Sequence, residues 1–267
     1  MSTKEQSVTL LRKNKQAQVA AFNAIGMTDV TENSRASEFA KRIKWAGGLL
    51  DICLAVQRYS DKSYWYFTKE EWDSLTNENK MKFIKRGLRV RAYGHSFVLA
   101  ANDCYDGDGN VIMAWGNRKN VEDLDNRNCG TAYNDFKGAE NTELILASLS
   151  GTTGSQGVEG APAAEAAKAY KAYTQEYDGI EDTSDWHLPG LGVLLIIYKC
   201  KNEIQEALEY FWSSESLLCK ATTNHYYWSS TEYTNEYAFG LSVHYGYISG
   251  AQYKETKNRV RAVCEEV

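Results

Sequence analysis

The sequence predicts an α+β protein, and three observations support this class. Apolar residues recur at helical spacing over residues 4–25 and 34–57. Apolar and polar residues alternate over 88–93 and 96–101, as in paired strands. Near the C-terminus, a tyrosine-rich segment interrupted by glycines favours an antiparallel hairpin. The 267 residues, 43% hydrophobic and 24% charged, suffice for one large folded domain or two ordinary ones.

Residues 1–60 are expected to form a helical assembly or docking region. The apolar stripes of its two helices consist of Leu10, Leu11, Val19, Phe22 and Ile25 in the first and Phe39, Ile43, Leu50 and Leu54 in the second. Gly26 is a candidate C-cap, and Ser34 or Ser37 a candidate N-cap. Short amphipathic helices cannot bury their stripes alone, so we expect them to pack together, on the remaining chain or on other copies.

Residues 61–95 are expected to form a connecting α/β segment. Tyr64–Phe67 has the composition of a strand, and Thr68 can cap a helix that continues to about Arg86 and stops at Gly87. Two strands, 88–93 and 96–101, are then predicted to turn at Gly94 and His95.

The acidic loop at 106–110 has two interpretations. Asp106 and Asp108 could suit a calcium ion, but an EF-hand loop would need an acid at position 117, which is Asn117. Glycines beside Asp and Asn favour a turn, so no metal is expected. Further along, residues 148–164 are predicted to be a mobile surface loop, and residues 163–173 an alanine-rich helix.

Charge and cysteine content narrow the possible partners. Residues 1–95 hold 17 Lys and Arg against 10 Asp and Glu, whereas residues 96–267 hold 13 against 25. The basic residues are mixed with acids in helical text, which favours a solvated helix face over a nucleic-acid site. No secretory signal and no apolar run of membrane-spanning length are present, so neither secretory export nor membrane insertion is expected. The six cysteines, without metal-ligand spacing, are expected to be reduced and buried: Cys53, Cys104, Cys129, Cys200, Cys219 and Cys264.

A set of motifs in the second half of the chain carries a family resemblance. They are Asp135-Phe136 and Asn141-Thr142, Trp186-His187-Leu188-Pro189 followed by a helix over 202–211, Tyr227-Trp228-Ser229-Ser230-Thr231-Glu232, and the ending Arg259-Val260-Arg261-Ala262-Val263. Their order resembles the C-type-lectin-like domains of variable proteins that diversity-generating retroelements alter in bacteria and phages. The resemblance covers about residues 135–267 and implies a lectin-like ligand-binding domain over 96–267. The chain departs from the pattern at Gly190-Leu191-Gly192, where related domains carry an acid, and at Phe239, where Trp is commoner.

The motif residues have structural roles in the first instance. Trp186 and Trp228 are expected in the core, each with its N–H bonded. The polar run 229–232 is expected to hydrogen-bond irregular backbone. Arg259 and Arg261 alternate with valines as in a last strand with one buried face, and one of them is expected to pair with Glu232.

The predicted ligand-binding face lies between these fixed points. Residues 222–256 combine seven tyrosines with Ser, Gly, Asn and His but hold only four charges, which resembles the composition of an antibody paratope. The alternative is a structural sheet, because tyrosine favours strands. The candidate binding residues are Asn224, His225, Tyr226, Tyr233, Asn235, Tyr237, Phe239, Ser242, His244, Tyr245, Tyr247, Ser249, Gln252 and Tyr253. The resemblance adds that retroelements change template adenines, which turns Asn-type codons into this repertoire.

An enzyme is not expected. The nearest enzymes that the resemblance suggests, sulfatase modifiers that generate formylglycine, need paired cysteines near the C-terminus, where this chain has only Cys264. No hydrolase, metalloprotease or nucleotide-binding motif is present, and His95, His187, His225 and His244 lack metal spacing. No cofactor is expected.

The resemblance therefore implies a phage receptor-binding protein of the tail-fibre type. It would assemble in the bacterial cytoplasm, form a trimer through residues 1–60, associate with other tail proteins and bind a host-surface protein or glycan. The alternatives are a bacterial surface adhesin and a structural virion protein without its own ligand.

Overall fold

The computed structural model describes residues 50–124, 128, 130–172, 182–212, 218 and 226–266. It confirms the α+β class, with helices and two sheets. Ile52–Val90 and Ser96–Val267 belong to one compact unit, and Met1–Asp51 with Arg91–His95 to another. The strands within 52–90 thus belong to the same unit as the motifs, whereas the predicted lectin-like domain begins at residue 96. The predicted helices before residue 50 lie outside the described residues.

The end of the predicted N-terminal helical region is a strand instead. β1 spans Asp51–Arg58, so the expected helix over 34–57 is wrong for its last residues, and so is the helical region as far as residue 60. Five consecutive residues of β1, from Cys53 to Gln57, are buried. A strand covered on both faces needs a continuous apolar run, which periodicity alone does not distinguish from a buried helix.

The connecting segment also differs from its prediction beyond Thr68. β2 spans Tyr64–Phe67, and Thr68 forms the predicted cap with a reciprocal bond from Glu71. The helix ends early, because α3 covers only Lys69–Ser74, α4 Asn77–Lys80, and β3 Phe83–Ala92. Gly87 is thus inside a strand, where a Cβ would overlap the Leu99 carbonyl. It allows close backbone approach and does not stop a helix.

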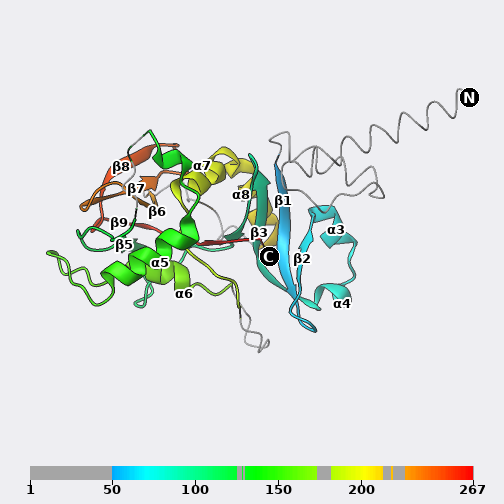
Figure 1. The fold of residues 1–267 in the computed structure, drawn as a ribbon. Coiled ribbons are helices and arrows are strands. Elements are labelled where there is room, and N and C mark those ends of the chain that lie inside the picture. Colours follow the sequence, from blue (N-terminus) through cyan, green and yellow to red (C-terminus); the bar gives the residue numbers. More distant parts are fainter. Residues whose placement is uncertain are drawn as a thin grey trace, which may run out of the picture. The chain divides into compact units, whose positions relative to one another are not determined.

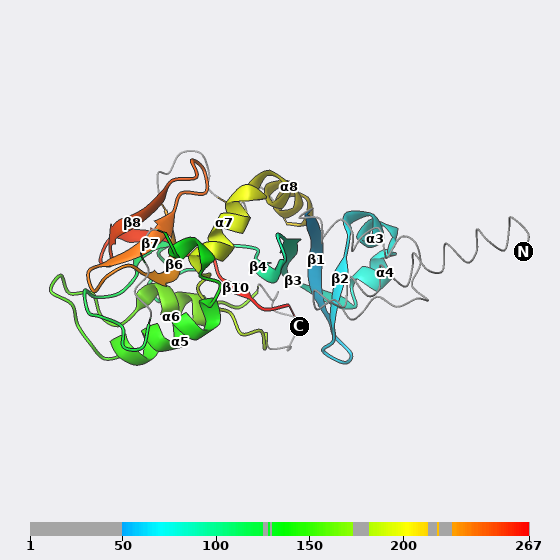
Figure 2. The same ribbon diagram turned by 45° about the horizontal axis from the view of Figure 1, so that its top comes forward.

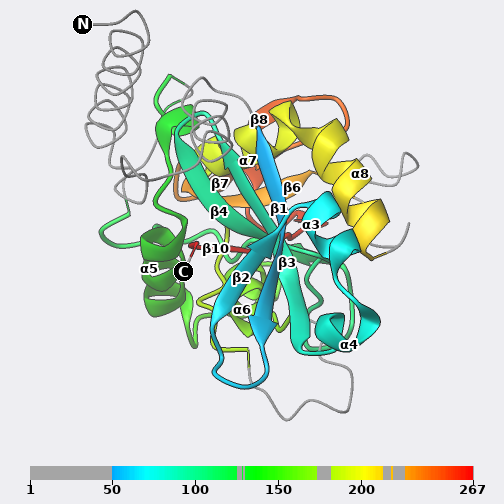
Figure 3. The ribbon, with the colours of Figure 1, turned by 90° about the vertical axis from the view of Figure 1, so that its right-hand side faces the viewer.

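The first sheet has the order β10-β4-β3-β1-β2, and Figure 3 looks onto its strands β1 to β4. β4 spans His95–Ala100 and β10 spans Val263–Cys264, so the C-terminal strand belongs to the sheet that contains β1. The predicted hairpin of β3 and β4 is confirmed, but it turns at Tyr93 and Gly94 rather than at Gly94 and His95, because His95 already belongs to β4. Tyr93 and Gly94 both have positive φ, 53° and 81°, as a tight hairpin turn requires.

The second sheet has the order β5-β9-β6-β7-β8 and contains the tyrosine-rich segment. Its strands are β5 Ile112–Ala114, β6 Tyr227–Glu232, β7 Tyr237–Leu241, β8 Ile248–Tyr253 and β9 Lys257–Arg259. The chain between them forms the 3-10 turn η1 Ala132–Asn134 and the helices α5 Gly138–Leu149, α6 Pro162–Ala169, α7 Leu191–Lys199 and α8 Lys201–Phe211. α7 contacts β6 and β7, and α5 contacts α6 (Figures 1 and 2).

The two predicted core tryptophans are buried, with 1% exposure for Trp186 and none for Trp228. The Trp228 indole donates to the Met113 carbonyl at 2.9 Å, and the Trp186 indole to Asp182 at 2.8 Å. Trp115, which the motifs did not include, is also fully buried and donates to the Ser229 carbonyl. Each of these three buried indoles thus has a hydrogen-bond acceptor, as a stable core requires.

Residues 229–232 lie in β6 rather than in an irregular loop, and their side chains bond groups outside the strand. The Thr231 hydroxyl accepts from the Leu191 amide and donates to Asp135, which holds the start of α7. Gly190 and Gly192 also pack closely on Asp135 and Phe136, so this start is anchored without the missing acid.

The expected pairing of an arginine with Glu232 is wrong. Arg259 and Arg261 both pair with Asp103, and the Tyr227 hydroxyl donates to the same carboxylate at 3.0 Å. Arg261 is 1% exposed and also donates to the Ala100 and Ala101 carbonyls. The C-terminal segment is therefore buried on the arginine face as well as on the valine face at Arg261. A guanidinium can lie in the core when a carboxylate and two carbonyls bond to it.

The remaining loop predictions concern residues 106–110 and 148–164. Asp106 accepts from the Asp108 and Asn110 amides, so its carboxylate caps a turn as predicted; β4 and β5, on either side, belong to different sheets. Residues 150–160 form a loop with one bridge, Thr153 to Glu159.

Cys53, Cys104, Cys200 and Cys264 are free and buried, whereas Cys129 and Cys219 lie outside the described residues. Among the described residues, no helix is long and apolar enough to cross a membrane.

Candidate functional site

The predicted binding residues cluster on the hairpin formed by β7 and β8, which we call the tyrosine hairpin (Tyr233–Tyr253). The residues Asn235, His244, Tyr245, Tyr247 and Tyr253 are exposed, and Tyr226, Tyr233, Tyr237, Ser249 and Gln252 are partly exposed. Asn224 and His225 lie outside the described residues. The exposure of Tyr245, Tyr247 and Tyr253 is 52%, 66% and 42%, so three large rings of this hairpin are exposed.

Two predicted binding residues, Phe239 and Ser242, are buried and require correction. Phe239 is 1% exposed, packs edge-to-face against Tyr233, and would contact a Cβ placed at Gly250. Ser242 is 4% exposed, and its hydroxyl accepts from the Tyr245 amide at 3.3 Å. Because both side chains are buried, they have no surface that a ligand could contact. Their role is to stabilise the hairpin.

One aromatic group, the tip cluster (His244, Tyr245 and Tyr247), lies in the loop between β7 and β8. The rings of Tyr245 and Tyr247 stack with centroids 5.8 Å apart, and the His244 ring meets Tyr245 edge-on at 4.4 Å. The loop backbone is closed by bonds from the Ser242 amide to the Tyr247 carbonyl and from the Gly246 amide to the Ser242 carbonyl. The exposed rings are therefore mounted on a hydrogen-bonded loop.

Residues outside the tyrosine-rich segment anchor this loop. Lys201, at the start of α8, donates to the His244 carbonyl at 2.9 Å and lies over the Tyr198 ring at 4.8 Å. The Tyr198 ring in turn packs against Gly246, whose φ is +75°. Glycine is required here twice, because a side chain would strain the left-handed backbone and overlap the tyrosine.

Gly246→Ala should therefore displace Tyr198 as well as strain the backbone. We expect a loss of about 1–2 kcal/mol in the free energy of unfolding from the left-handed conformation, together with faster amide exchange over residues 242–247. The matched control is Gly109→Ala, because Gly109 has a φ of +82° and no atom near its Cβ position. Urea unfolding and hydrogen exchange measure both effects. Equal loop exchange in the two variants would contradict the anchoring role of Tyr198.

The second aromatic group, the open-end cluster, lies where β7 begins and β8 ends. Tyr237 pairs with Tyr253 across the strands, and their rings are 4.6 Å apart. The hydrogen bond to Tyr253 raises the pKa of Tyr237. The Arg118 guanidinium lies 4.2 Å from the Tyr253 ring centroid, and its Nε is 2.8 Å from the Glu255 carboxylate. Sequence reasoning missed Arg118 because it follows β5, far from the tyrosine-rich segment.

The edge of β8 is poorly suited to strand addition. β8 is the outermost strand of its sheet and carries no charge or proline along Ile248–Tyr253. However, its register with β7 shifts between the pairs Ala238–Gln252 and Gly240–Ser249. Such a bulge twists an edge and interrupts pairing, which is one way in which proteins prevent edge-to-edge association. The hairpin therefore presents side chains rather than a regular open strand edge.

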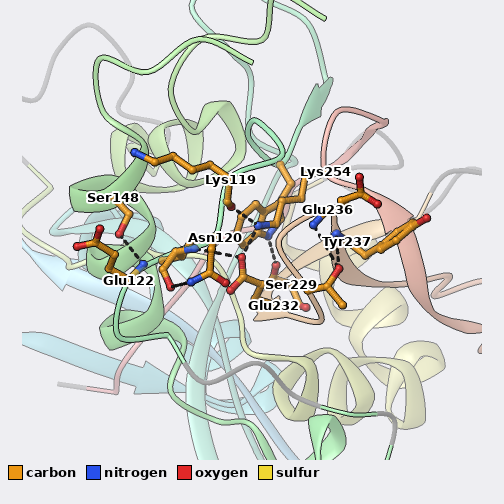
Figure 4. Close-up of polar contacts among 12 residues, drawn as sticks. Lys119, Asn120, Glu122, Ser148, Ser229, Glu232, Glu236, Tyr237 and Lys254 are labelled. Atoms are coloured by element: carbon orange, nitrogen blue, oxygen red, sulfur yellow. Dashed lines mark hydrogen bonds and ion pairs between the residues drawn. The ribbon is translucent and has the colours of Figure 1, made fainter. Parts of the chain in front are cut away.

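A buried ion pair fixes the two ends of the tyrosine hairpin to the core. Glu232 immediately precedes Tyr233, Lys254 immediately follows Tyr253, and their side chains form an ion pair with no exposure (Figure 4). Lys254 also donates to the Lys119 carbonyl at 2.7 Å, and Glu232 accepts from the Val121 amide. Burial raises the pKa of Glu232 and lowers that of Lys254, while each partner's charge opposes the shift.

The groups on and beside the hairpin are mainly aromatic and hydroxyl groups. Among the residues that the structure describes, no group of three or more His, Cys, Asp or Glu is placed to hold a metal ion. A cavity of about 280 Å³ exists elsewhere in the fold, and none of the hairpin residues lines it. What the hairpin offers is exposed aromatic area, hydroxyl groups and one guanidinium.

A comparison with protein-family models finds no match, and comparisons with curated proteins and with solved structures find none either. Function is therefore inferred from the residues and their geometry.

Proposed function

We propose that this chain is a non-enzymatic ligand-binding protein that recognises a host-surface receptor through the tyrosine hairpin. The observation that carries the proposal is the contrast within one hairpin. Tyr245, Tyr247 and Tyr253 are exposed, while the flanking Glu232 and Lys254 are completely buried. Rigid amphipathic rings give large contact area at low entropic cost, and paratopes use them for that reason.

The proposal includes a C-type-lectin-like domain and a phage tail-fibre adhesin. Its support is the motif set, whose Trp186 and Trp228 lie in the core and whose Thr231 holds the start of α7. In related variable proteins such a frame carries residues that retroelements diversify. Trimer formation through residues 1–60 belongs to the same proposal. A near-copy of the DNA that encodes the hairpin, beside a reverse-transcriptase gene, would support the retroelement.

The binding test uses the double variant Tyr245→Ser/Tyr247→Ser. We expect binding of the labelled protein to bacterial cells to fall about tenfold or more, because a few Tyr anchors usually carry an interface. The melting temperature should stay nearly unchanged, since both rings are exposed. The cells are a strain panel that includes the strain whose DNA encodes the chain.

The matched control is Tyr105→Ser/Tyr133→Ser. These two tyrosines are 61% and 48% exposed but lie outside the hairpin. The control should bind like the wild type. Equal binding by the hairpin variant, or equal loss in the control, would refute the assignment of the binding surface.

A further inference from the structure

We propose that Arg118 determines which partner the tyrosine hairpin binds, because its guanidinium binds a carboxylate on the surface of a partner protein. This inference rests on the proposed function, because it assumes that the hairpin binds a partner. It goes beyond it by naming the chemical group that is recognised and a residue outside the tyrosine-rich segment.

Arg118 is held in place before any partner arrives. Its guanidinium lies over the Tyr253 ring, and its Nε is paired with Glu255. The Glu255 side chain is only 2% exposed and accepts from the Ser155 hydroxyl and the Gln156 amide. Because its orientation is already fixed, little conformational freedom is lost when the guanidinium binds, which favours affinity.

The guanidinium keeps a pair of donors for a partner. Glu255 contacts the Nε edge, and within the described part of the chain no hydrogen bond or ion pair holds the terminal nitrogens Nη1 and Nη2. The Arg118 side chain is 29% exposed, beside the exposed ring of Tyr253. Two parallel N–H groups of an arginine match the two oxygens of a carboxylate.

Most charges of the tyrosine-rich segment are already paired, so Arg118 is the main charged group available beside the exposed hairpin rings. Of the four charged residues in 222–256, Glu232 and Lys254 neutralise each other in the core and Glu255 is paired with Arg118. Lys119 and Lys257 are exposed, and Glu236, which is partly exposed, is the remaining acid of the segment. A carboxylate is therefore the complementary group, and tyrosine with arginine is the pair of residue types most typical of protein–protein hot spots.

The size of the surface favours a protein over a small ligand. The tip cluster and the open-end cluster lie at opposite ends of β8, which at about 3.3 Å per residue separates them by roughly 20 Å. Small ligands bind in concave sites, whereas these rings are exposed and do not line the 280 Å³ cavity. A partner that touches both clusters has the dimensions of a protein interface.

Arg58 provides a matched control. It too lies over an aromatic ring, Trp65 at 5.2 Å, and beside an acid, Asp61. Its Nε and Nη2 both bond to Asp61, so one bidentate edge of this guanidinium is already occupied by a carboxylate. Arg58→Gln thus removes the same charge and the same kind of stacking, at a guanidinium that already holds a carboxylate of the chain through two nitrogens and lies outside the tyrosine hairpin.

The first experiment needs no knowledge of the partner. Sodium acetate is titrated into the full-length ¹⁵N-labelled protein at constant ionic strength, with sodium chloride as the reference, and the arginine side-chain signals are followed. We expect a saturable shift of the Arg118 signals, abolished in Arg118→Gln, and a much smaller one for Arg58. A shift at Arg118 no larger than that at Arg58 would overturn the proposal.

The second experiment uses the bacterial cells that bind the wild type. Cell binding by Arg118→Gln should fall about tenfold or more, binding by Arg118→Lys should be intermediate, and binding by Arg58→Gln should equal that of the wild type. Converting cell-surface carboxylates to amides with carbodiimide and glycinamide, or removing surface proteins with proteinase K, should abolish wild-type binding. Binding that survives proteinase K would overturn the assignment to a protein partner.

The two proposals fail in different ways. If Arg118→Gln binds cells like the wild type while Tyr245→Ser/Tyr247→Ser does not, the hairpin is the binding surface and the role of Arg118 is refuted. If neither set of variants changes cell binding, or no cells bind, the proposed function falls, while the acetate titration still decides whether Arg118 is a carboxylate site.

Discussion

Lys254→Met should destabilise the protein by about 3–5 kcal/mol, because it leaves the Glu232 carboxylate buried without its counter-charge. Both side chains have no exposure, and the Lys254 ammonium also lies 4.7 Å from the Trp115 ring centroid and donates to the Lys119 carbonyl. Methionine replaces the aliphatic stem but none of these bonds. Urea unfolding at neutral pH measures the loss.

The double variant Glu232→Gln/Lys254→Met distinguishes a buried pair from a packing effect. It removes both charges, so it should cost less than Lys254→Met alone, since the main penalty of the single variant is the uncompensated carboxylate. Lys257→Met, three residues further along and exposed, is the control and should change stability by less than about 0.5 kcal/mol. A double variant that is no more stable than Lys254→Met would contradict an ion pair that fixes the ends of the hairpin.

Local signals predicted the parts of the fold that local chemistry decides. Thr68 and Glu71 form a capping box from side chains three residues apart, and the turn at Tyr93 and Gly94 needs only positive φ. Trp186 and Trp228 are buried because large apolar groups with one N–H fit no other place so well. In each case the information lies within a few residues of the feature.

The errors arose where tertiary context decides. Leu54 fits a helical stripe and also a strand covered on both faces, so the spacing could not show that 51–58 is β1. Gly87 has the identity of a helix stop, yet it serves the close approach of β3 to Leu99. The expected pairing of Arg259 or Arg261 with Glu232 was wrong because their acid, Asp103, is distant in sequence and only the fold brings it near.

The candidate site was predicted in composition but not in support. Tyrosines 245, 247 and 253 are exposed, whereas Phe239 has the right residue type and is buried beneath Tyr233. The hairpin is supported by residues more than 40 positions away in sequence: Arg118 lies over Tyr253, Lys201 bonds to His244, and Tyr198 packs against Gly246. Glu255, which is close to the hairpin in sequence, in turn pairs with Arg118. The composition of the segment shows which aromatic side chains it contains. Only the strand register shows which of these side chains face outward.

Replacing Trp228 and replacing Tyr245 should have opposite consequences, because Trp228 in β6 lies in the core and Tyr245 lies on the surface of the hairpin. Trp228 is completely buried, and its indole donates to the Met113 carbonyl at 2.9 Å. Trp228→Ala creates a cavity and leaves that carbonyl without its donor, so the free energy of unfolding should fall by about 3–5 kcal/mol. Tyr245 is 52% exposed, and Tyr245→Ser should cost less than about 1 kcal/mol.

Urea unfolding of the two variants gives the order of stability, and cell binding at a temperature where both are folded gives the function. We expect Tyr245→Ser to unfold almost like the wild type and to bind less, because its ring is surface that only a partner covers. Trp228→Ala should keep whatever binding its folded fraction allows, since the indole touches no partner. If Tyr245→Ser lost more stability than Trp228→Ala, the hairpin rings would be structural side chains of a sheet, and a binding role for them would be refuted.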